Sequence, residues 1–327
     1  MNEIEHCPWH ETQWDILTRD LARLSHALLL GGQPGLGKFA FATRLARSLL
    51  CDSSGPDARA CGSCKSCLLV RAGTHPDLRL VEPAEEGKPI TVDQVRALVD
   101  FATTRPHTAQ RKVVIMRSAQ AMNLNAANSL LKLLEEPPLG NVFVLVSDRP
   151  NRLPATVRSR CQLVDFKPPP RDAGTAWLAE RGVAVGKADT LLALAGGAPL
   201  QALVLWEVGF LDQRAELFDD MEAIRRHTAD PVSRAARWQG LGPELCLEWL
   251  QRLVSDLIKV AMLGDGAPGL VNADLASRLQ ALVEGLNLKQ LYGYADAVSQ
   301  ARELLKSPLD GLLLLEDILI RWRRVTQ

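Results

Sequence analysis

A glycine-rich loop between an apolar segment and a helix constrains this chain more than any other feature. Residues 28–31 read Leu-Leu-Leu-Gly, and the spacing G-x-x-x-x-G-K starts at Gly32 and runs through Gly35 and Gly37 to Lys38. In such a loop, backbone N–H groups cradle phosphate oxygens at the start of the next helix, and the lysine reaches over them. Strand, loop and helix follow in the order that the motif requires. The sequence therefore predicts a phosphate-binding loop.

Two positions depart from what a Mg²⁺-dependent ATPase needs. Phe39 stands where the motif has Ser or Thr, whose hydroxyl coordinates the Mg²⁺ of the nucleotide. The buried strand predicted at residues 112–116 is the natural place of a Walker B element, yet Arg117 and Ser118 follow it instead of acidic side chains. We therefore expect a degenerate site without metal chemistry, in which ATP hydrolysis is absent. Whether Lys38 and the loop amides still bind a phosphate or ATP is left open.

Four of the seven cysteines lie close together in the sequence, at Cys51, Cys61, Cys64 and Cys67. Four thiolates at this spacing can close tetrahedrally around Zn²⁺ and leave no open position for substrate, so we expect a structural zinc module at about residues 51–67. An odd number of cysteines and the absence of a recognisable secretion signal argue against a disulfide framework. Buried or redox-active cysteines are the alternative. His75 could replace one ligand, but we interpret it as the residue that leads the chain back to the sheet.

Composition excludes some classes of function. The 38 basic residues balance the 38 acidic ones, so no overall positive field would hold nucleic acid, and contact with DNA would have to be local or made through partners. The first residues lack the basic start and apolar run of a signal peptide, and no apolar segment is long enough to cross a bilayer. We therefore expect a cytoplasmic protein with no membrane partner.

Hydrophobic periodicity divides the chain into an alternating part and a helical part. Strands are predicted at residues 27–30, 77–81, 112–116, 142–146 and 162–166, and helices at 11–24, 39–50, 92–102 and 126–136. This alternation is typical of an α/β domain with a mainly parallel sheet. Residues 167–170 read Lys-Pro-Pro-Pro, a stiff linker, and only helices are expected after it.

The last predicted helix is apolar over a wide arc, formed by Leu312, Leu313, Leu314, Leu315, Ile318, Leu319 and Ile320. This arc is wider than packing against one other helix would need. A buried core helix is one interpretation, and a helix that also packs against neighbouring subunits is the other.

Three features together resemble one family closely. They are the four-cysteine insert, the segment 128–138 (Asn-Ser-Leu-Leu-Lys-Leu-Leu-Glu-Glu-Pro-Pro) and Arg158-Ser159-Arg160-Cys161. On these, and on Pro8-Trp9 and residues 26–29, the whole chain is similar to the AAA+ clamp-loader subunits of bacterial DNA polymerase III. The resemblance implies an AAA+ P-loop domain at residues 1–166, a small helical lid domain at 167–205 and a helical collar domain at 206–327. Five subunits form a ring through such collars.

The resemblance also implies a role for one arginine. The segment Ser159-Arg160-Cys161 looks like the family's SRC motif, whose arginine projects as an arginine finger into the ATP site of an adjacent motor subunit. Arg160 is thus the catalytic group that this chain would donate in trans, and Arg158 is a weaker candidate. Alternatively, Arg160 pairs with a carboxylate of its own domain. Residues 196–199 (Gly-Gly-Ala-Pro) lack the sensor arginine that the family's motor subunits carry there.

The function that we expect is that of a non-hydrolysing stator in a hetero-pentameric clamp loader, beside motor ATPase subunits and a delta subunit. It would help to place the sliding clamp on primed DNA, without intrinsic enzyme activity, since polymerase chemistry belongs to other subunits of the holoenzyme. The alternative is an ATP-hydrolysing motor subunit of the same machine. A zinc-dependent nucleic-acid-binding module is the weakest hypothesis, because no aromatic residues alternate with the basic residues near the cysteines.

Overall fold

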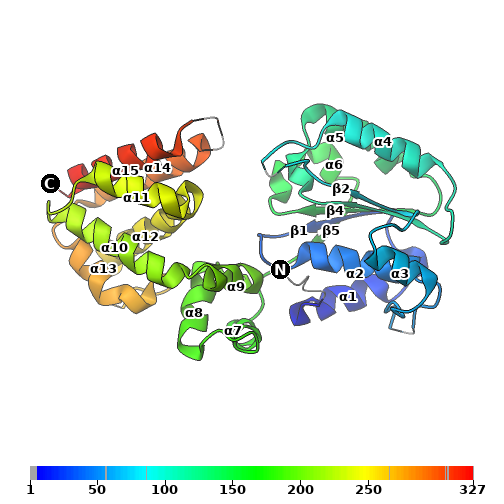
Figure 1. The fold of residues 1–327 in the computed structure, drawn as a ribbon, viewed down its shortest axis with the longest axis horizontal. Coiled ribbons are helices and arrows are strands. Elements are labelled where there is room, and N and C mark those ends of the chain that lie inside the picture. Colours follow the sequence, from blue (N-terminus) through cyan, green and yellow to red (C-terminus); the bar gives the residue numbers. More distant parts are fainter. Residues whose placement is uncertain are drawn as a thin grey trace. The chain divides into compact units, whose positions relative to one another are not determined.

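The computed structural model describes residues 6–55, 57–85, 87–264, 266–305, 307 and 309–326. The chain forms two compact units, residues 1–169 and 170–327 (Figure 1). The boundary falls within the proline linker that the sequence predicts. The further division of the second unit into a lid and a collar remains a prediction.

The first unit is built on a five-stranded parallel sheet. Its strands lie in the order β2 (Leu78–Val81), β3 (Lys112–Met116), β4 (Asn141–Ser147), β1 (Ala27–Gly31) and β5 (Gln162–Asp165). Every pairing between these strands is parallel, and Leu29 lies opposite both Leu145 and Leu163. The three central strands are buried along their whole length, as expected of a parallel sheet with both faces covered. The predicted α/β class with a mainly parallel sheet is confirmed.

Helices cover both faces of this sheet (Figure 1). One face carries α1 (Glu11–Thr18), α2 (Lys38–Leu50) and α3 (Lys65–Arg71), and the other carries α4 (Val92–Thr103), α5 (Leu124–Glu135) and α6 (Ala155–Arg158). A capping box starts α4, because the Thr91 side chain accepts from the Gln94 N–H and the Gln94 side chain accepts from the Thr91 N–H. In parallel sheets with helices on both faces, ligands bind at the carboxyl ends of the strands.

The first helix is shorter than the predicted span of residues 11–24. It ends at Thr18, and a 3₁₀ turn (Leu21–Arg23) follows. Asp20 has an extended φ of −143°, and its side chain accepts a hydrogen bond from the N–H of Ala22. Such a local bond competes with helix propagation, which the apolar spacing does not reveal.

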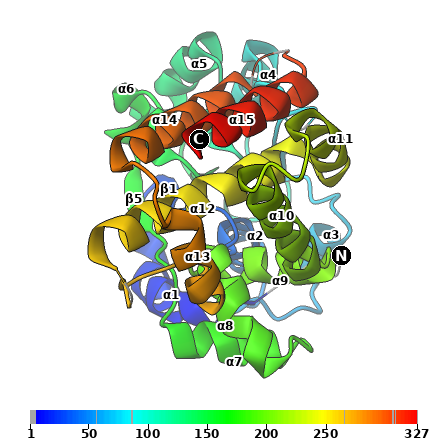
Figure 2. The ribbon, with the colours of Figure 1, turned by 90° about the vertical axis from the view of Figure 1, so that its left-hand side faces the viewer.

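The second unit contains only helices within the described residues (Figures 1 and 2). Three short ones come first, α7 (Arg171–Ala179), α8 (Val185–Leu194) and α9 (Pro199–Glu207). They are followed by α10 (Phe210–Arg225), α11 (Pro231–Leu241), α12 (Pro243–Leu263), α13 (Ala276–Val283), α14 (Leu288–Leu304) and α15 (Gly311–Val325). No single described helix has the length and apolar character to cross a membrane, although α8 and α9 pass that test as a pair bent by 114°.

The last helix uses part of its apolar arc in the core of the second unit. Helix α15 packs against α10, α11, α12 and α14, and it buries Leu315, Ile318, Leu319 and Trp322. Leu313, on the other side of the helix, is 62 % exposed. The core interpretation is confirmed for the buried side, and packing of the exposed side against other subunits remains a prediction.

Candidate functional site

The glycine-rich loop lies at the carboxyl end of β1 and leads into α2. Gly32 has a φ of 150°, and a Cβ there would lie 2.3 Å from the carbonyl oxygen of Phe166, so a larger residue would displace the backbone. Gly37, the residue before α2, has a left-handed φ of 83°. Gly35 lies between them, also with a positive φ. The loop therefore has the sharp backbone turns for which its glycines are needed.

Two ring N–H groups bind the backbone of this loop at one carbonyl. The Nε1 of Trp9 donates to the carbonyl of Leu36 at 3.0 Å, and the Nε2 of His10 lies 2.6 Å from the same oxygen. His10 is 2 % exposed, and burial lowers its pKa to about 4, so the neutral ring donates through Nε2. The sequence pattern carries no signal for this role of His10, because the contact joins residues 26 positions apart.

We expect His10 to make the first unit sensitive to acid. The pKa of His10 is about 4 in the folded chain, against 6.5 for an ordinary histidine, so between these pH values the unfolded state binds the extra proton. Stability should fall by about 3 kcal/mol as the pH drops from 7 to 4. Urea unfolding at several pH values checks this, with His10→Gln losing that part of the pH dependence. The exposed His107, changed to Gln, is the control, and equal pH dependence in both variants would contradict the assignment.

Lys38 is bonded to groups of the protein itself. Its side chain is 3 % exposed, and its Nζ donates to the carbonyl of Gln33 at 2.5 Å and to the carboxylate of Asp148 at 2.6 Å. Burial lowers the pKa of the Lys38 amine, and the Asp148 carboxylate opposes that shift. Asp148 directly follows β4, the neighbour of β1, so the parallel sheet brings it to the loop. In the sequence, an acidic residue immediately after a predicted buried strand is the signal that would have indicated Asp148 as a partner of Lys38.

The two residues that depart from the ATPase pattern contact each other. Arg117 follows β3, and its guanidinium carbon lies 4.8 Å from the centroid of the Phe39 ring. The Nη1 of Arg117 also lies 3.4 Å from the carboxylate of Glu82, which follows β2. A ring and a positive charge therefore occupy the positions that supply a hydroxyl and a carboxylate in a Mg²⁺-dependent site. The charge of Arg117 disfavours a divalent cation there.

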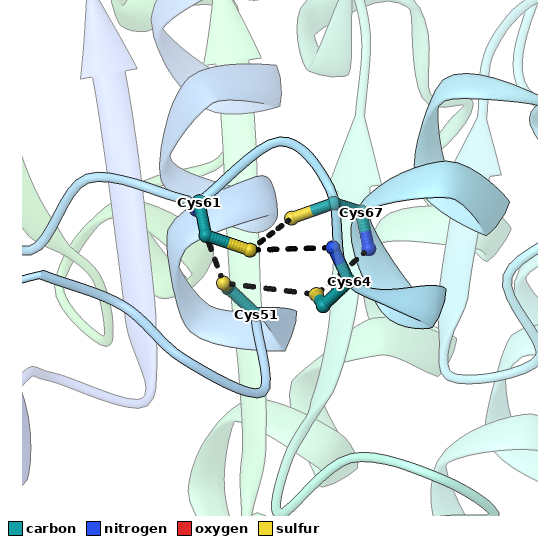
Figure 3. Close-up of side chains that lie close together, drawn as sticks. All are labelled: Cys51, Cys61, Cys64 and Cys67. Carbon is teal, nitrogen blue, oxygen red and sulfur yellow. Dashed lines mark hydrogen bonds between the residues drawn. The ribbon is translucent and has the colours of Figure 1, made fainter.

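The four predicted cysteines come together where α2 ends and α3 begins, with Cys51 directly after α2 and Cys67 in the first turn of α3 (Figure 3). Their sulfur atoms all lie within 4.8 Å of one another, and two pairs, Cys51 with Cys64 and Cys61 with Cys67, are separated by 3.9 Å. Four sulfurs placed tetrahedrally at about 2.3 Å from Zn²⁺ would be about 3.8 Å apart. The geometry therefore fits a metal ion held by all four thiolates.

Backbone N–H groups prepare these sulfurs for negative charge. The N–H groups of Cys61, Cys64 and Cys67 donate to the sulfurs of Cys51, Cys61 and Cys64, respectively, at 3.3 to 3.4 Å. Hydrogen bonds from the backbone N–H groups of Ser63 and Cys64 lower the pKa of the Cys61 thiol to about 6. Burial raises the pKa of the Cys67 thiol to about 12, an effect that a coordinated metal ion would reverse.

His75 does not join the cysteines. Among the described residues, the group that could hold a metal ion contains the four cysteines alone. The Nδ1 of His75 accepts a hydrogen bond from the N–H of Asp77 at 3.0 Å, directly before β2. The interpretation of His75 as the residue that leads back to the sheet is confirmed.

Arg160 lies just after α6, where the Ser159 hydroxyl, at 3.4 Å from Nη1, and two further groups of its own unit hold its guanidinium. Its Nη1 donates to the carbonyl of Thr156 at 2.9 Å, and its Nη2 lies 2.5 Å from the carboxylate of Glu135. The Arg160 side chain is still 35 % exposed. Arg158 is also exposed, and its Nη1 donates to Asn151 at 3.2 Å. In the chain by itself, Arg160 therefore makes the ion pair that the sequence leaves as an alternative.

Comparison with known proteins gives the family. A family model described as "DNA polymerase III, delta subunit" matches residues 9–170, and its C-terminal counterpart matches residues 209–324. The chain is 38 % identical to DNA polymerase III subunit delta' of Pseudomonas aeruginosa, over 96 % of both chains. The chain belongs to the delta-prime family of DNA polymerase III subunits. It is also 33 % identical to the delta-prime subunit of Escherichia coli K12, over 96 % of this chain and 94 % of that one.

The candidate groups of this delta-prime family member lie at separate places in its first unit. The glycine-rich loop is at the carboxyl end of β1, the cysteines lie at the end of α2 and the start of α3, and Arg160 follows α6. Among solved structures, a gamma-subunit-related protein of DNA polymerase III from Thermotoga maritima is similar, with 19 % identity and a TM-score of 0.42. That match covers 96 % of this chain and 100 % of the other.

Proposed function

We propose that this chain is a non-hydrolysing subunit of a DNA polymerase III clamp loader, which helps to place the sliding clamp on primed DNA. Membership of the delta-prime family over nearly the whole chain supports the assignment to this complex. The observation that carries the non-hydrolysing part is the contact between Phe39 and Arg117. Phosphoryl transfer from ATP needs Mg²⁺ at these positions, and losing its ligands costs several kcal/mol of transition-state stabilisation.

The contacts of Lys38 also support a subunit that does not hydrolyse ATP. A buried lysine needs a counter-ion, and Asp148 already supplies one at 2.6 Å. A nucleotide phosphate would have to displace this carboxylate and would gain no metal bridge in return. Binding of ATP should therefore be weak and independent of Mg²⁺.

Nucleotide binding to the isolated chain tests this proposal. We expect weak ATP binding that is the same with and without Mg²⁺, measured by calorimetry, and no ATP hydrolysis. The Asp148→Asn variant should bind ATP or inorganic phosphate more tightly than the wild type, because the buried Lys38 then lacks a charged partner. Asp165→Asn, which removes an exposed carboxylate at the last residue of β5, is the matched control. Tight, Mg²⁺-dependent ATP binding by the wild type would instead favour the motor subunit.

We infer that Arg160 acts in trans, at the ATP site of a neighbouring motor subunit in a ring of five subunits that also contains a delta subunit. Its partial exposure and its place after the short helix α6 are compatible with this role. An arginine supplied by a partner stabilises the charge that develops on the transferring phosphoryl group. A stator that donates one such group needs no ATP chemistry of its own.

We also propose that Cys51, Cys61, Cys64 and Cys67 bind one structural Zn²⁺. Their sulfur separations and the N–H donors around them support this assignment. When bound, the ion would cross-link the end of α2 to the start of α3 and fix the loop between them. A set of four protein ligands provides no position for a reacting water, so we assign the ion no catalytic role.

A further inference from the structure

The carboxylate that meets Arg160 comes from a position that is unfavourable for a negative charge. Glu135 is the last residue of α5, and the C-terminal end of a helix dipole disfavours anions. Pro137 and Pro138 follow closely and prevent the helix from continuing, so the position of Glu135 at its end is well defined. A carboxylate at the unfavourable end of a helix dipole needs a compensating interaction. The ion pair with Arg160 at 2.5 Å supplies it.

The guanidinium of Arg160 is held from two sides. The carbonyl of Thr156, the second residue of α6, accepts from Nη1, and Glu135 on α5 accepts from Nη2. Helices α5 and α6 pack against each other, so the two acceptors belong to one rigid framework. A guanidinium has five N–H donors, and these two bonds, with a third from Nη1 to the Ser159 hydroxyl at 3.4 Å, leave others available. Arg160 can therefore be oriented by its own unit and still present donors outward.

We propose that Glu135 is the positioning residue of Arg160, holding its guanidinium in the orientation in which it reaches the phosphate of a neighbouring subunit. The inference rests on the proposed role of Arg160 in trans. A free arginine side chain must give up its rotamer freedom when it meets a ligand, and pre-orientation removes that cost. The carboxylate acts through Arg160 and does not itself approach the nucleotide.

Substitutions at Glu135 in the assembled clamp loader test the inference. In single-turnover ATP hydrolysis, Glu135→Ala should lower the rate at the adjacent site about threefold to tenfold, the range expected for releasing one ordered side chain. Glu135→Gln should stay within about twofold of the wild type, because an amide oxygen still accepts from Nη2. Glu136→Ala, at the next exposed residue, should leave the rate unchanged. Gel filtration and thermal unfolding of each variant check assembly and folding.

A double substitution separates the inference from the proposed function. In the Arg160→Ala background, Glu135→Ala should cause no further loss, since its effect passes through the arginine. If Arg160→Ala lowers hydrolysis but Glu135→Ala does not, or if Glu135→Ala raises it, the positioning role is wrong and the role of Arg160 stands. Equal losses in Glu135→Ala and Glu135→Gln would also overturn the positioning role. If Arg160→Ala changes nothing, the proposed function itself fails.

Discussion

Replacing Arg160 with alanine is expected to slow ATP hydrolysis at the adjacent motor site of the assembled clamp loader by about 10³-fold or more. The guanidinium would stabilise charge on the transferring phosphoryl group only when the subunits meet, so the isolated chain should lose nothing. The partial exposure of Arg160 in the free chain leaves it accessible to such a neighbour. Single-turnover hydrolysis resolves the adjacent site from the other ATP sites of the complex, which should keep their rates.

Arg158→Ala is the control for this experiment. Arg158 is the last residue of α6, two positions before Arg160, carries the same charge and is bonded to Asn151. Its removal should change hydrolysis far less than removal of Arg160. Equal losses in the two variants would indicate a general electrostatic effect, and full activity in Arg160→Ala would remove the arginine from this role.

Loss of one zinc ligand should have the largest effect on stability. We expect one Zn²⁺ per chain in the wild type and none in Cys64→Ser, because the Cys64 sulfur lies within 4.8 Å of all three other sulfurs. Binding free energies of structural Zn²⁺ in small modules are on the order of 10 kcal/mol at neutral pH, so losing the ion should unfold the loop around the cysteines. Metal analysis and thermal unfolding measure the two consequences.

Ser63→Ala is the matched control for the cysteine substitution. Ser63 is exposed in the same loop, and its hydroxyl lies 3.8 Å from the Cys61 sulfur without belonging to the ligand set. This variant should keep its metal and its thermal stability. Full metal content in Cys64→Ser would show that the assignment of the four ligands is wrong.

The sequence by itself was sufficient for features that depend on neighbouring residues. The strand predicted at residues 112–116 has the same ends in the structure, because a short apolar run must be buried to be stable. The helix predicted to begin at residue 92 also begins there, because the Thr91 side chain caps it through local hydrogen bonding. The four cysteines could be recognised as one set because a zinc module takes its ligands from a short segment. These features supported the α/β class and the candidate zinc site.

The spacing of apolar residues alone did not determine where the first helix ends or which side of the last helix is buried. The spacing of apolar residues continues to Leu24, yet α1 ends at Thr18, because the side chain of Asp20 binds a backbone N–H. The wide apolar arc of α15 likewise does not distinguish core from surface. Only the packing against α10, α11, α12 and α14 identifies the side that is buried.

The partners of the candidate site residues were decided by tertiary structure alone. The strand order β3-β4-β1 brings Asp148 to Lys38 across 110 residues of sequence and brings Arg117 to Phe39, while the packing of α6 on α5 brings Glu135 to Arg160. The sequence identified the glycine-rich loop, the two departures from an ATPase and the arginine, since each is a property of one segment. The counter-ions depend on which strands and helices become neighbours, and that is set by the packing of the whole unit.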